Sequence, residues 1–394
     1  MLINWKTFGK EWVKFDVRFY NNELLMKLAF VGDLCFGRHI REEYESNNSQ
    51  FIPRAIVERI KTTNSKVIAN LESPVSEFFQ NQNMQFCGNP GILEQFKWID
   101  CFSLANNHIN DFGEEAIEST VRNLDNYGIS YNGIYRKEYQ PYLIEEGDCK
   151  IAVICCAPRV NVPFAENCKF RLLQNNDSLL YETINKYKTA GYLVIVYTHM
   201  GSMFCSYPNP SVFESTHKLI DAGCDCVFVS HPHCIGGIYK YNDVPVFYSL
   251  GDFLMDGASF RRRQAFSVSL NIKSNKIVSW DVIPTITTKD LKVDFPKKRI
   301  EKKILKSITK VADRIEKNQR NYNSFYKWQY KKDIIKHSLS TMYFLYSTEG
   351  IAGITKGIKG SKGMALRFKH GSSAAKISKE AESGHYSLRN FERK

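Results

Sequence analysis

Residues 225–237 read DCVFVSHPHCIGG, and this stretch holds the pattern from which the fold can be predicted. Its apolar run, 226–230, is short and bounded by polar residues, which is typical of a buried strand. Two histidines, His231 and His233, follow where that strand is expected to end. A polar side chain at the end of a buried strand is a feature that recurs along much of the chain.

Other short apolar runs also predict buried strands. They cover residues 27–31, 67–71, 100–105, 151–156, 193–198 and 246–250. Helical stretches are expected at 113–127, which starts with acidic residues, and at 212–222, and a glycine lies at or just beyond the end of each. Residues 266–283 form two alternating runs around a polar turn, which predicts an antiparallel hairpin. Strands that alternate with helices predict an α/β architecture, with helices layered over sheet.

Composition excludes several classes of protein. The chain has 394 residues, of which 43% are hydrophobic and 13% aromatic, so it can form one large or two ordinary cores and is not globally disordered. No run of about 18 apolar residues is present, which excludes a spanning helix. Residues 1–25 form a charged leader without the apolar segment of a secretory signal. A cytoplasmic location is expected, and a peripheral place at the inner membrane face stays open.

The eleven cysteines favour a reduced protein over a disulfide framework. Their number is odd, and Cys101, Cys155, Cys156 and Cys226 lie inside apolar runs that predict strands. No CxxC pair occurs, so a structural zinc knuckle is not expected. The cysteines are therefore predicted to be buried thiols.

Charge divides the chain into parts. Residues 296–394 contain 24 basic and 8 acidic residues, a balance of +16, whereas the whole chain carries +13. We therefore predict a leader at 1–25, a domain at 26–295 and a basic extension at 296–394. The extension is helix-prone up to residue 345, and its Gly, Ser and Lys content from 349 onward is consistent with a mobile tail. Such a charge asymmetry suggests contact with an anionic partner.

The polar residues at the predicted strand ends form a candidate metal-binding set. They are Asp33, Glu72, Asn107, His199, His231 and His233. Ligands bind beyond the carboxyl ends of strands in α/β sheets, so residues distant in sequence can converge there. A mixed oxygen and nitrogen set suits Mn, Fe or Zn, and six ligands suit two divalent ions that share a carboxylate. Each residue alone is more often a cap or turn residue, so the prediction rests on the set as a whole.

Other residues have a functional and a structural interpretation. His108 follows Asn107 and could donate a proton to a leaving oxygen. Arg38 could contact an anionic substrate or be a surface arginine, and Arg261–Arg263 suit phosphate or carboxylate binding, although a solvated loop is the favoured interpretation. His217 and His337 are expected to be structural or surface residues.

Six motifs together resemble those of the CapA family, the bacterial capsule synthesis proteins linked to poly-γ-glutamate, within the calcineurin-like metallophosphoesterase superfamily. They are FVGDLCFGR (30–38), NLESPVS (70–76), LANNHINDFG (104–113), THMG (198–201), DCVFVSHPHCIGG (225–237) and VFYSLGDFLMD (246–256). The resemblance covers roughly residues 26–285. It implies a four-layer α/β/β/α fold and a dinuclear metal site whose ligands match the six residues above, with Glu72 where the bridging carboxylate belongs.

The chain also departs from the family pattern. Cys35 stands where the superfamily commonly has the histidine of Asp-x-His, and it is either a soft-metal ligand or an inert thiol. Met200 replaces a usual tryptophan. Asp252 replaces the asparagine of SLGN, which is expected to alter the rim and charge of the site. Many members carry an N-terminal membrane anchor, which is not seen here.

These features lead to functional hypotheses of different classes. The first is a CapA-like metal-dependent phosphoesterase or hydrolase in capsule or exopolymer biosynthesis. The alternative is a non-catalytic assembly factor that binds an anionic cell-envelope polymer. Nucleic-acid binding by the basic extension is not expected, because no recognised motif is present and its aromatics Tyr322, Phe325, Tyr326, Trp328 and Tyr330 are predicted to pack on the body. A peripheral membrane contact through 337–347 is a further option, against the simpler one of a core-packing helix.

Overall fold

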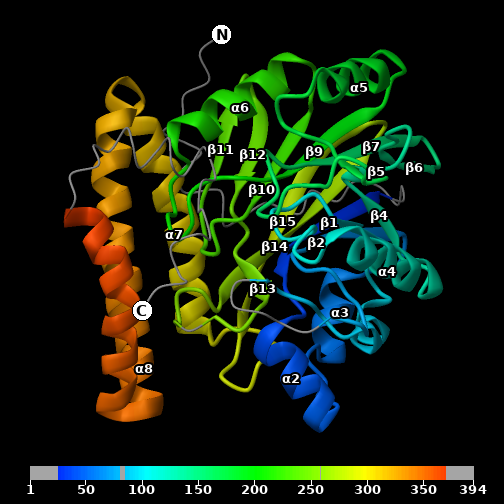
Figure 1. The fold of residues 1–394 in the computed structure, drawn as a ribbon. Coiled ribbons are helices and arrows are strands. Elements are labelled where there is room, and N and C mark those ends of the chain that lie inside the picture. The colour runs from blue at the N-terminus through cyan, green and yellow to red at the C-terminus, as the bar shows by residue number, and fades with distance from the viewer. Residues whose placement is uncertain (1–24, 80–84, 258, 370–394) are drawn as a thin grey trace.

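Two β-sheets packed face to face form the centre of the computed structural model, which describes residues 25–79, 85–257 and 259–369. Helices cover the outer face of each sheet, so the layers follow the order α/β/β/α (Figure 1). The predicted α/β sandwich is therefore confirmed. Nearly all of the predicted leader lies outside the described residues.

The first sheet has eight strands. In chain order they are β1 (Met26–Leu34), β2 (Ser65–Leu71), β3 (Cys101–Ser103), β4 (Ser130–Asn132), β13 (Asp252–Leu254), β14 (Gln264–Lys273), β15 (Lys276–Thr287) and β16 (Val293–Asp294). Strands β1 to β4 pair in parallel, and β14 continues the sheet from β1 in the antiparallel sense. The short β13 pairs in parallel with the carboxyl end of β1.

The second sheet has six strands in the order β11-β12-β10-β9-β7-β6. They are β6 (Tyr142–Glu146), β7 (Cys149–Cys156), β9 (Leu193–His199), β10 (Cys226–Ser230), β11 (Ile238–Tyr241) and β12 (Val244–Tyr248). The central strands β7, β9, β10 and β12 are parallel, so their carboxyl ends lie along one edge. A separate two-stranded sheet joins β5 (Ile134–Tyr135) and β8 (Arg171–Leu172).

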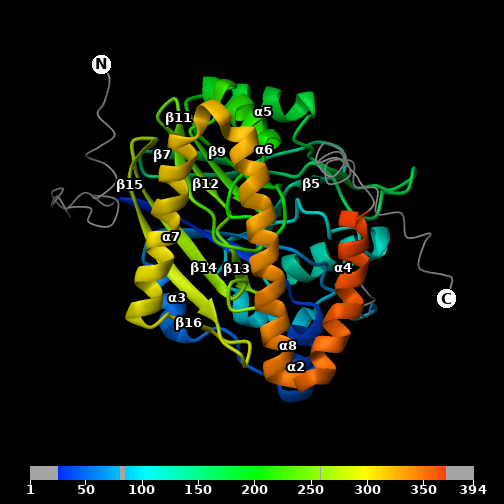
Figure 2. The same cartoon turned by 90° about the vertical axis from the view of Figure 1, so that its left-hand side faces the viewer.

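The helices fall into three groups. On the side of the first sheet lie α2 (Arg38–Asn47), α3 (Arg54–Ile60), the 3-10 helix η1 (Pro90–Phe96) and α4 (Gly113–Asn126). The second sheet is covered by α5 (Ser178–Thr189) and α6 (Pro210–Asp221). Along one side stand α7 (Lys298–Lys317), η2 (Gln319–Asn321) and α8 (Tyr322–Lys369) (Figure 2). Among them, α6 begins two residues before its predicted start, at Pro210, and the Asn209 side chain accepts the backbone N–H of Val212.

Aromatic side chains join the two sheets. Phe30 of β1 stacks on Phe228 of β10 with 3.8 Å between ring centroids, and Phe228 stacks on Phe247 at 4.6 Å. The hydroxyl of Tyr197 on β9 donates a hydrogen bond to the carbonyl oxygen of Val31 at 2.9 Å. All of these rings are fully buried. The two sheets are therefore held in a fixed relation, which matters because each sheet contributes half of the candidate site.

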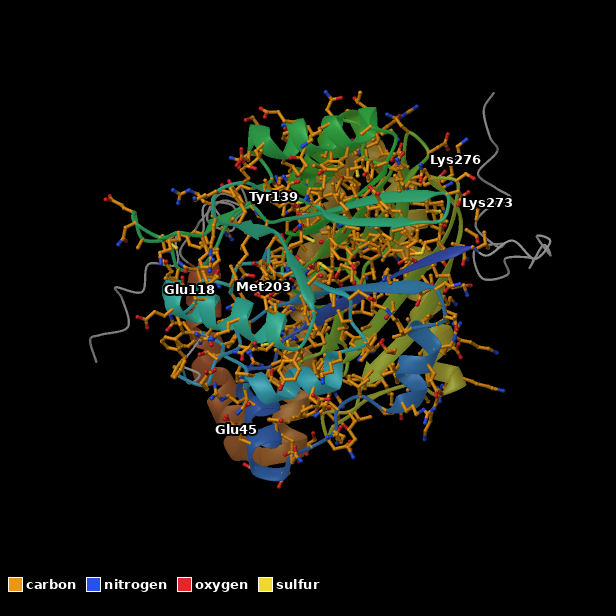
Figure 3. The ribbon with its side chains drawn as sticks, turned by 90° about the vertical axis from the view of Figure 1, so that its right-hand side faces the viewer. Glu45, Glu118, Tyr139, Met203, Lys273 and Lys276 are labelled. Carbon is orange, nitrogen blue, oxygen red and sulfur yellow. The ribbon has the colours of Figure 1, made fainter. Side chains whose placement is uncertain are left out.

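The strands and helices predicted from the sequence are present. Each of the seven predicted apolar runs contains a strand, and the two predicted helices correspond to α4 and α6. The hairpin is β14–β15, and Figure 3 shows Lys273 and Lys276 at its turn. Several boundaries differ by a few residues; β12, for example, ends at Tyr248, and the chain then crosses to the other sheet as β13. All eleven cysteines are free and buried, as predicted.

The C-terminal extension differs from expectation in two places. Residues 349–369, expected in a mobile tail, continue helix α8, while 370–394 lie outside the described residues. Tyr322, Phe325, Tyr326 and Tyr330 pack on the body as predicted, but Trp328 is exposed, so its predicted packing is wrong. The division of the chain into three parts stays a prediction.

Candidate metal centre

Two carboxylates reach the site from the first sheet. Strands β1 and β2 are parallel neighbours, so Asp33 near the end of β1 and Glu72 just beyond β2 lie at the same edge. The Asn70 amide donates to Asp33 Oδ1 at 2.8 Å, and the Glu72 backbone N–H donates to the carbonyl of Leu34 at 2.7 Å. Both carboxylates are almost completely buried. Buried carboxylates of this kind need a cation or several donors.

Three histidines reach the same place from the second sheet. His199 ends β9 and pairs in register with Ser230, the last residue of β10. His231 and His233 follow at φ values of 97° and 52°, an unusual backbone conformation for non-glycine residues. The backbone N–H of His231 donates to Asp33 Oδ2 at 3.1 Å, which joins the two sheets at the site. The turn after β10 thus places both imidazoles against the carboxylates of the first sheet.

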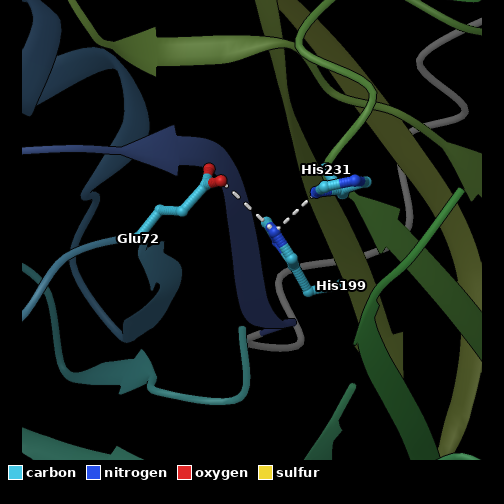
Figure 4. Close-up of side chains that lie close together, drawn as sticks. All are labelled: Glu72, His199 and His231. Carbon is cyan, nitrogen blue, oxygen red and sulfur yellow. Dashed lines mark hydrogen bonds and ion pairs between the residues drawn. The ribbon is translucent and has the colours of Figure 1, made fainter. Parts of the chain in front are cut away.

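The first group of ligand atoms surrounds the Nε2 atom of His199. Asn107 Oδ1 lies 2.8 Å from it, His231 Nδ1 3.0 Å and Glu72 Oε1 3.4 Å (Figure 4). The Nδ1–H of His199 can donate to Ser230 Oγ at 2.9 Å, which leaves Nε2 with its lone pair. In the tautomer of His231 that leaves its Nδ1 unprotonated, four atoms with lone pairs face one another, and a divalent cation among them would satisfy all four.

The second group consists of Asp33, His233 and Asp252. His233 Nδ1 lies 2.8 Å from Asp252 Oδ1, so this N–H can donate to the carboxylate and orient the ring. The Nε2 atom of His233 then lies 3.4 Å from Glu72 Oε1. Glu72 Oε1 is therefore at the same distance from a ring nitrogen of each group, and Glu72 Oε2 is buried with no hydrogen-bond partner. This donor set fits two divalent ions of the Mn, Fe or Zn type that share Glu72.

Burial and neighbouring charges shift the pKa values of the clustered side chains in different directions. Burial, together with the neighbouring His199 and His233, holds the pKa of His231 well below its usual value, so its imidazole is neutral. Burial opposes the charged form of His233, but Glu72 and Asp252 raise the pKa of His233 to about 9. Burial and the charge of Glu72 raise the pKa of Asp33 to about 6. The buried carboxylates outnumber the positive groups that pair with them, and a bound cation would compensate this excess of negative charge.

Asp252 was not predicted as part of the ligand set, and its expected place on the rim is wrong. It is fully buried and lies opposite Asp33 in the register of β13 and β1. The approach is close, because a Cβ added at Gly32 would lie 2.0 Å from the carbonyl oxygen of Gly251. A signal was present in the sequence, since Gly251-Asp252 repeats the Gly32-Asp33 pair.

His108 is held beside the centre by a carboxylate that was also missed. Its Nδ1 lies 2.7 Å from Asp111 Oδ2, and its ring packs on Phe86 with 4.4 Å between centroids. The backbone N–H of His108 donates to Asn106 Oδ1 at 3.0 Å. Asp111 orients the ring and leaves Nε2 as the atom that can exchange a proton. The spacing of three residues in the loop 106–112 could have indicated this pair.

Arg38 and Cys35 lie close to the centre without joining either group. Arg38 donates from Nε to Asp256 Oδ2 at 2.8 Å, and its guanidinium lies 5.0 Å from the ring centroid of Phe86. Its predicted contact with an anionic substrate stays a prediction. Burial raises the pKa of Cys35 to about 12, which favours the inert thiol over the soft-metal ligand.

Two of the three adjacent arginines do not form a solvated loop, so that favoured interpretation is wrong for them. Arg261 pairs with Asp333 of α8 at 3.1 Å and donates to Ser206 Oγ at 2.9 Å. Arg262 lies 3.4 Å from Asp252 Oδ2, and its guanidinium lies 5.5 Å from the ring centroid of Phe204. These contacts connect α8 to the second group of ligands.

His337 of α8 completes this connection, and it predicts a pH effect on stability. Its ring stacks on Phe204 at 3.8 Å, and burial with the charges of Arg262 and Arg261 lowers its pKa to about 4. The unfolded chain, with a histidine pKa of about 6.5, binds more protons than the native state between these values. Stability therefore falls as the pH falls from about 6.5 to about 4.

His337→Phe keeps a ring that can stack but cannot be protonated. Between pH 7 and pH 4.5, we expect its free energy of unfolding to decrease by about 1–2 kcal/mol less than that of the wild type. This difference is smaller than the full pKa shift would give, because the ring of His337 is partly exposed to solvent. Urea unfolding at both pH values measures the difference. An equal decrease in the free energy of unfolding of the two proteins would show that the ring of His337 does not take up a proton on unfolding.

The chain is similar to known capsule synthesis proteins. The family model described as "Bacterial capsule synthesis protein PGA_cap" matches residues 27–257. The PGA biosynthesis protein CapA of Bacillus subtilis is 27% identical over 310 residues, covering 75% of this chain and 80% of that protein. The capsule biosynthesis protein CapA of Bacillus anthracis is 25% identical over 284 residues, covering 68% and 69%.

Proposed function

This chain belongs to the bacterial capsule synthesis family PGA_cap, and from that membership we propose that it is a metal-dependent hydrolase of the phosphoesterase type that takes part in capsule or exopolymer biosynthesis. The family match covers more than half of the chain and includes both groups of ligands. The names of its relatives point to the pathway, and the chemistry of the site points to the reaction.

The position of Glu72 is the observation that carries the proposal. Its Oε1 atom lies 3.4 Å from Nε2 of His199 and 3.4 Å from Nε2 of His233, and its Oε2 atom is buried without a partner. Each of these rings has a second partner for its other nitrogen, Ser230 Oγ and Asp252 Oδ1 respectively. A carboxylate between two oriented imidazoles is the arrangement that a shared metal ligand requires.

The residues around the centre support hydrolysis of an anionic ester. Two divalent ions held here would polarise a phosphoryl oxygen and supply a nucleophilic water at neutral pH. His108, oriented by Asp111, can hold a proton at Nε2 and release it to a leaving oxygen. The guanidinium of Arg38, which pairs with Asp256, lies over the ring of Phe86, on which His108 also packs, so a negatively charged substrate at His108 would lie near a cation. The near-complete burial of Asp33 and Glu72 keeps bulk water away from the carboxylates.

The test is to measure metal content and turnover in the same preparation. We expect the purified protein to bind about two Mn²⁺ ions per chain and to hydrolyse an aryl phosphodiester or monoester. We expect Asp33→Ala and His231→Ala to lose turnover and bound metal, because each removes a ligand from one of the two groups. Equal turnover in the wild type and both variants, or a wild type without bound metal, would contradict the proposal.

A second candidate is supported by the charge of the extension. Residues 296–394 carry a balance of +16, which suits a non-catalytic assembly factor that binds an anionic cell-envelope polymer. Salt-sensitive binding of poly-γ-glutamate or acidic polysaccharide by the full chain, without turnover on any phosphoester, would favour this function over the hydrolase. Unchanged polymer binding at low and high salt would exclude it.

A further inference from the structure

Helix α8 has one face that packs on the body. The hydroxyl of Tyr322 donates to the carbonyl of Pro208 at 2.8 Å, and that of Tyr326 donates to Ser202 Oγ at 2.8 Å. About two turns further, the buried Asp333 accepts the backbone N–H of Ser206 at 3.1 Å and pairs with Arg261. These contacts fix the helix to the loop 202–208, which directly follows the THMG motif that contains His199.

The opposite face of α8 presents apolar side chains to solvent. Five large apolar residues are exposed there, by 54–75% of their surface: Trp328, Ile335, Leu339, Tyr343 and Tyr346. Their spacing of seven, four, four and three residues places them on one side of the helix. The six other large apolar side chains that are exposed in the described part of the chain are scattered over separate segments. We refer to the five as the outer stripe.

Positive charge borders the outer stripe. Between residues 322 and 347 the basic residues are Lys327, Lys331, Lys332 and Lys336, and the ammonium group of Lys332 lies 4.7 Å from the ring centroid of Trp328. The one acidic residue in this stretch, Asp333, is buried on the inner face. Within residues 322–347 the exposed charges are therefore all positive, and the next acidic residue, Glu349, follows Tyr346 by three positions. Helix α7 stands beside α8 on the same side of the molecule and adds exposed lysines (Figure 2).

We propose that the outer stripe of α8 is a docking surface for an anionic lipid bilayer, on which the helix lies in the plane of the membrane interface. Aromatic and aliphatic side chains on one face of a helix, bordered by lysines, are the composition of interfacial helices. Among the described residues no helix has the length and apolarity needed to cross a bilayer, so α8 lies on the surface and does not span it. The inner face of α8 then holds the loop after His199, and with it the metal centre, near the membrane.

The apolar content of the stripe favours lipid over the other partners that a basic surface attracts. A soluble polyanion needs only the lysines, and burying Trp328, Ile335 and Leu339 against it would provide little free energy. A bilayer interface takes up both components, because acyl chains accommodate the apolar groups and anionic headgroups attract the lysines. The net charge of +13 would also oppose close approach of a second copy of the chain.

The experiment compares two triple variants that keep every charge. The stripe variant is Trp328→Gln, Ile335→Gln and Leu339→Gln, since glutamine preserves helix propensity. The matched control is Phe78→Gln, Leu143→Gln and Val278→Gln, which removes exposed apolar groups elsewhere. Co-sedimentation of the full chain is measured with vesicles of about 30% phosphatidylglycerol in phosphatidylcholine, and with phosphatidylcholine alone. Circular dichroism checks that each variant keeps its helix content.

We expect the wild type and the control to bind the anionic vesicles with similar affinity and the stripe variant to bind at least about tenfold more weakly. Binding should decrease with added salt and be weak on phosphatidylcholine alone. Failure of the wild type to bind anionic vesicles at low salt overturns the proposal, whatever the variants do. So does equal binding by the stripe variant, or a wild-type dimer that only the stripe variant dissociates. Turnover plays no part in this readout, so it is independent of the proposed hydrolase.

Discussion

Replacing Glu72 with glutamine is expected to reduce bound metal from about two ions per chain to one or none and to lower phosphodiester turnover at least about 10³-fold. The substitution keeps the size of the side chain but removes the negative charge that lies 3.4 Å from a ring nitrogen of each ligand group. The loss should exceed that of Asp33→Ala or His231→Ala, because each of those residues belongs to one group only. Element analysis and steady-state kinetics of the same preparation measure both effects.

The control for this prediction is Glu77→Gln, five residues further along the same segment. Glu77 is exposed and belongs to neither ligand group, so its variant should keep the metal content and turnover of the wild type. Two bound ions in Glu72→Gln would show that Glu72 is not the shared ligand. A loss of turnover with both ions retained would instead give Glu72 a role in the reaction itself.

Replacing Phe228 with alanine is expected to lower the free energy of unfolding by about 4 kcal/mol. The ring of Phe228 is fully buried between the two sheets, stacked on Phe30 at 3.8 Å and on Phe247 at 4.6 Å. Its removal leaves a cavity that two rigid sheets cannot close, so both the transfer free energy and the packing are lost. Urea unfolding of the metal-free protein measures the change without a contribution from bound ions.

Phe78→Ala is the matched control, since it removes the same ring from an exposed position. Its free energy of unfolding should lie within about 0.5 kcal/mol of the wild type. If Phe228→Ala destabilised the protein by no more than this control, the contact between the sheets would not depend on the stacked aromatic rings.

The principal strands and six candidate ligands could be predicted because the information for them is local. A buried strand needs a short apolar run, and the residue that follows it occupies the edge of the sheet whatever the rest of the chain does. Asp33, Glu72, Asn107, His199, His231 and His233 follow or end such runs, and the structure brings all six together. The hairpin β14–β15 was predictable for the same reason.

Asp252 could not be placed in this way. The strand that carries it, β13, has three residues and pairs with β1, which lies more than two hundred positions earlier in the chain. The local pattern at 246–250 predicts a strand but not the crossing to the other sheet that follows it. That crossing depends on the close approach of Gly32 to Gly251, a contact between distant segments that has no local signature.

Helix α8 shows the same division between local and long-range information. Its helical propensity and positive charge are visible in the sequence. Which of its faces meets the body depends on partners elsewhere, such as Ser206 for Asp333 and Phe204 for His337. Apolar periodicity identifies a side chain that can be buried, but burial requires a complementary surface, and that surface exists only after the two sheets have packed. Trp328 has the composition of a core residue and is exposed because nothing in the described chain covers it.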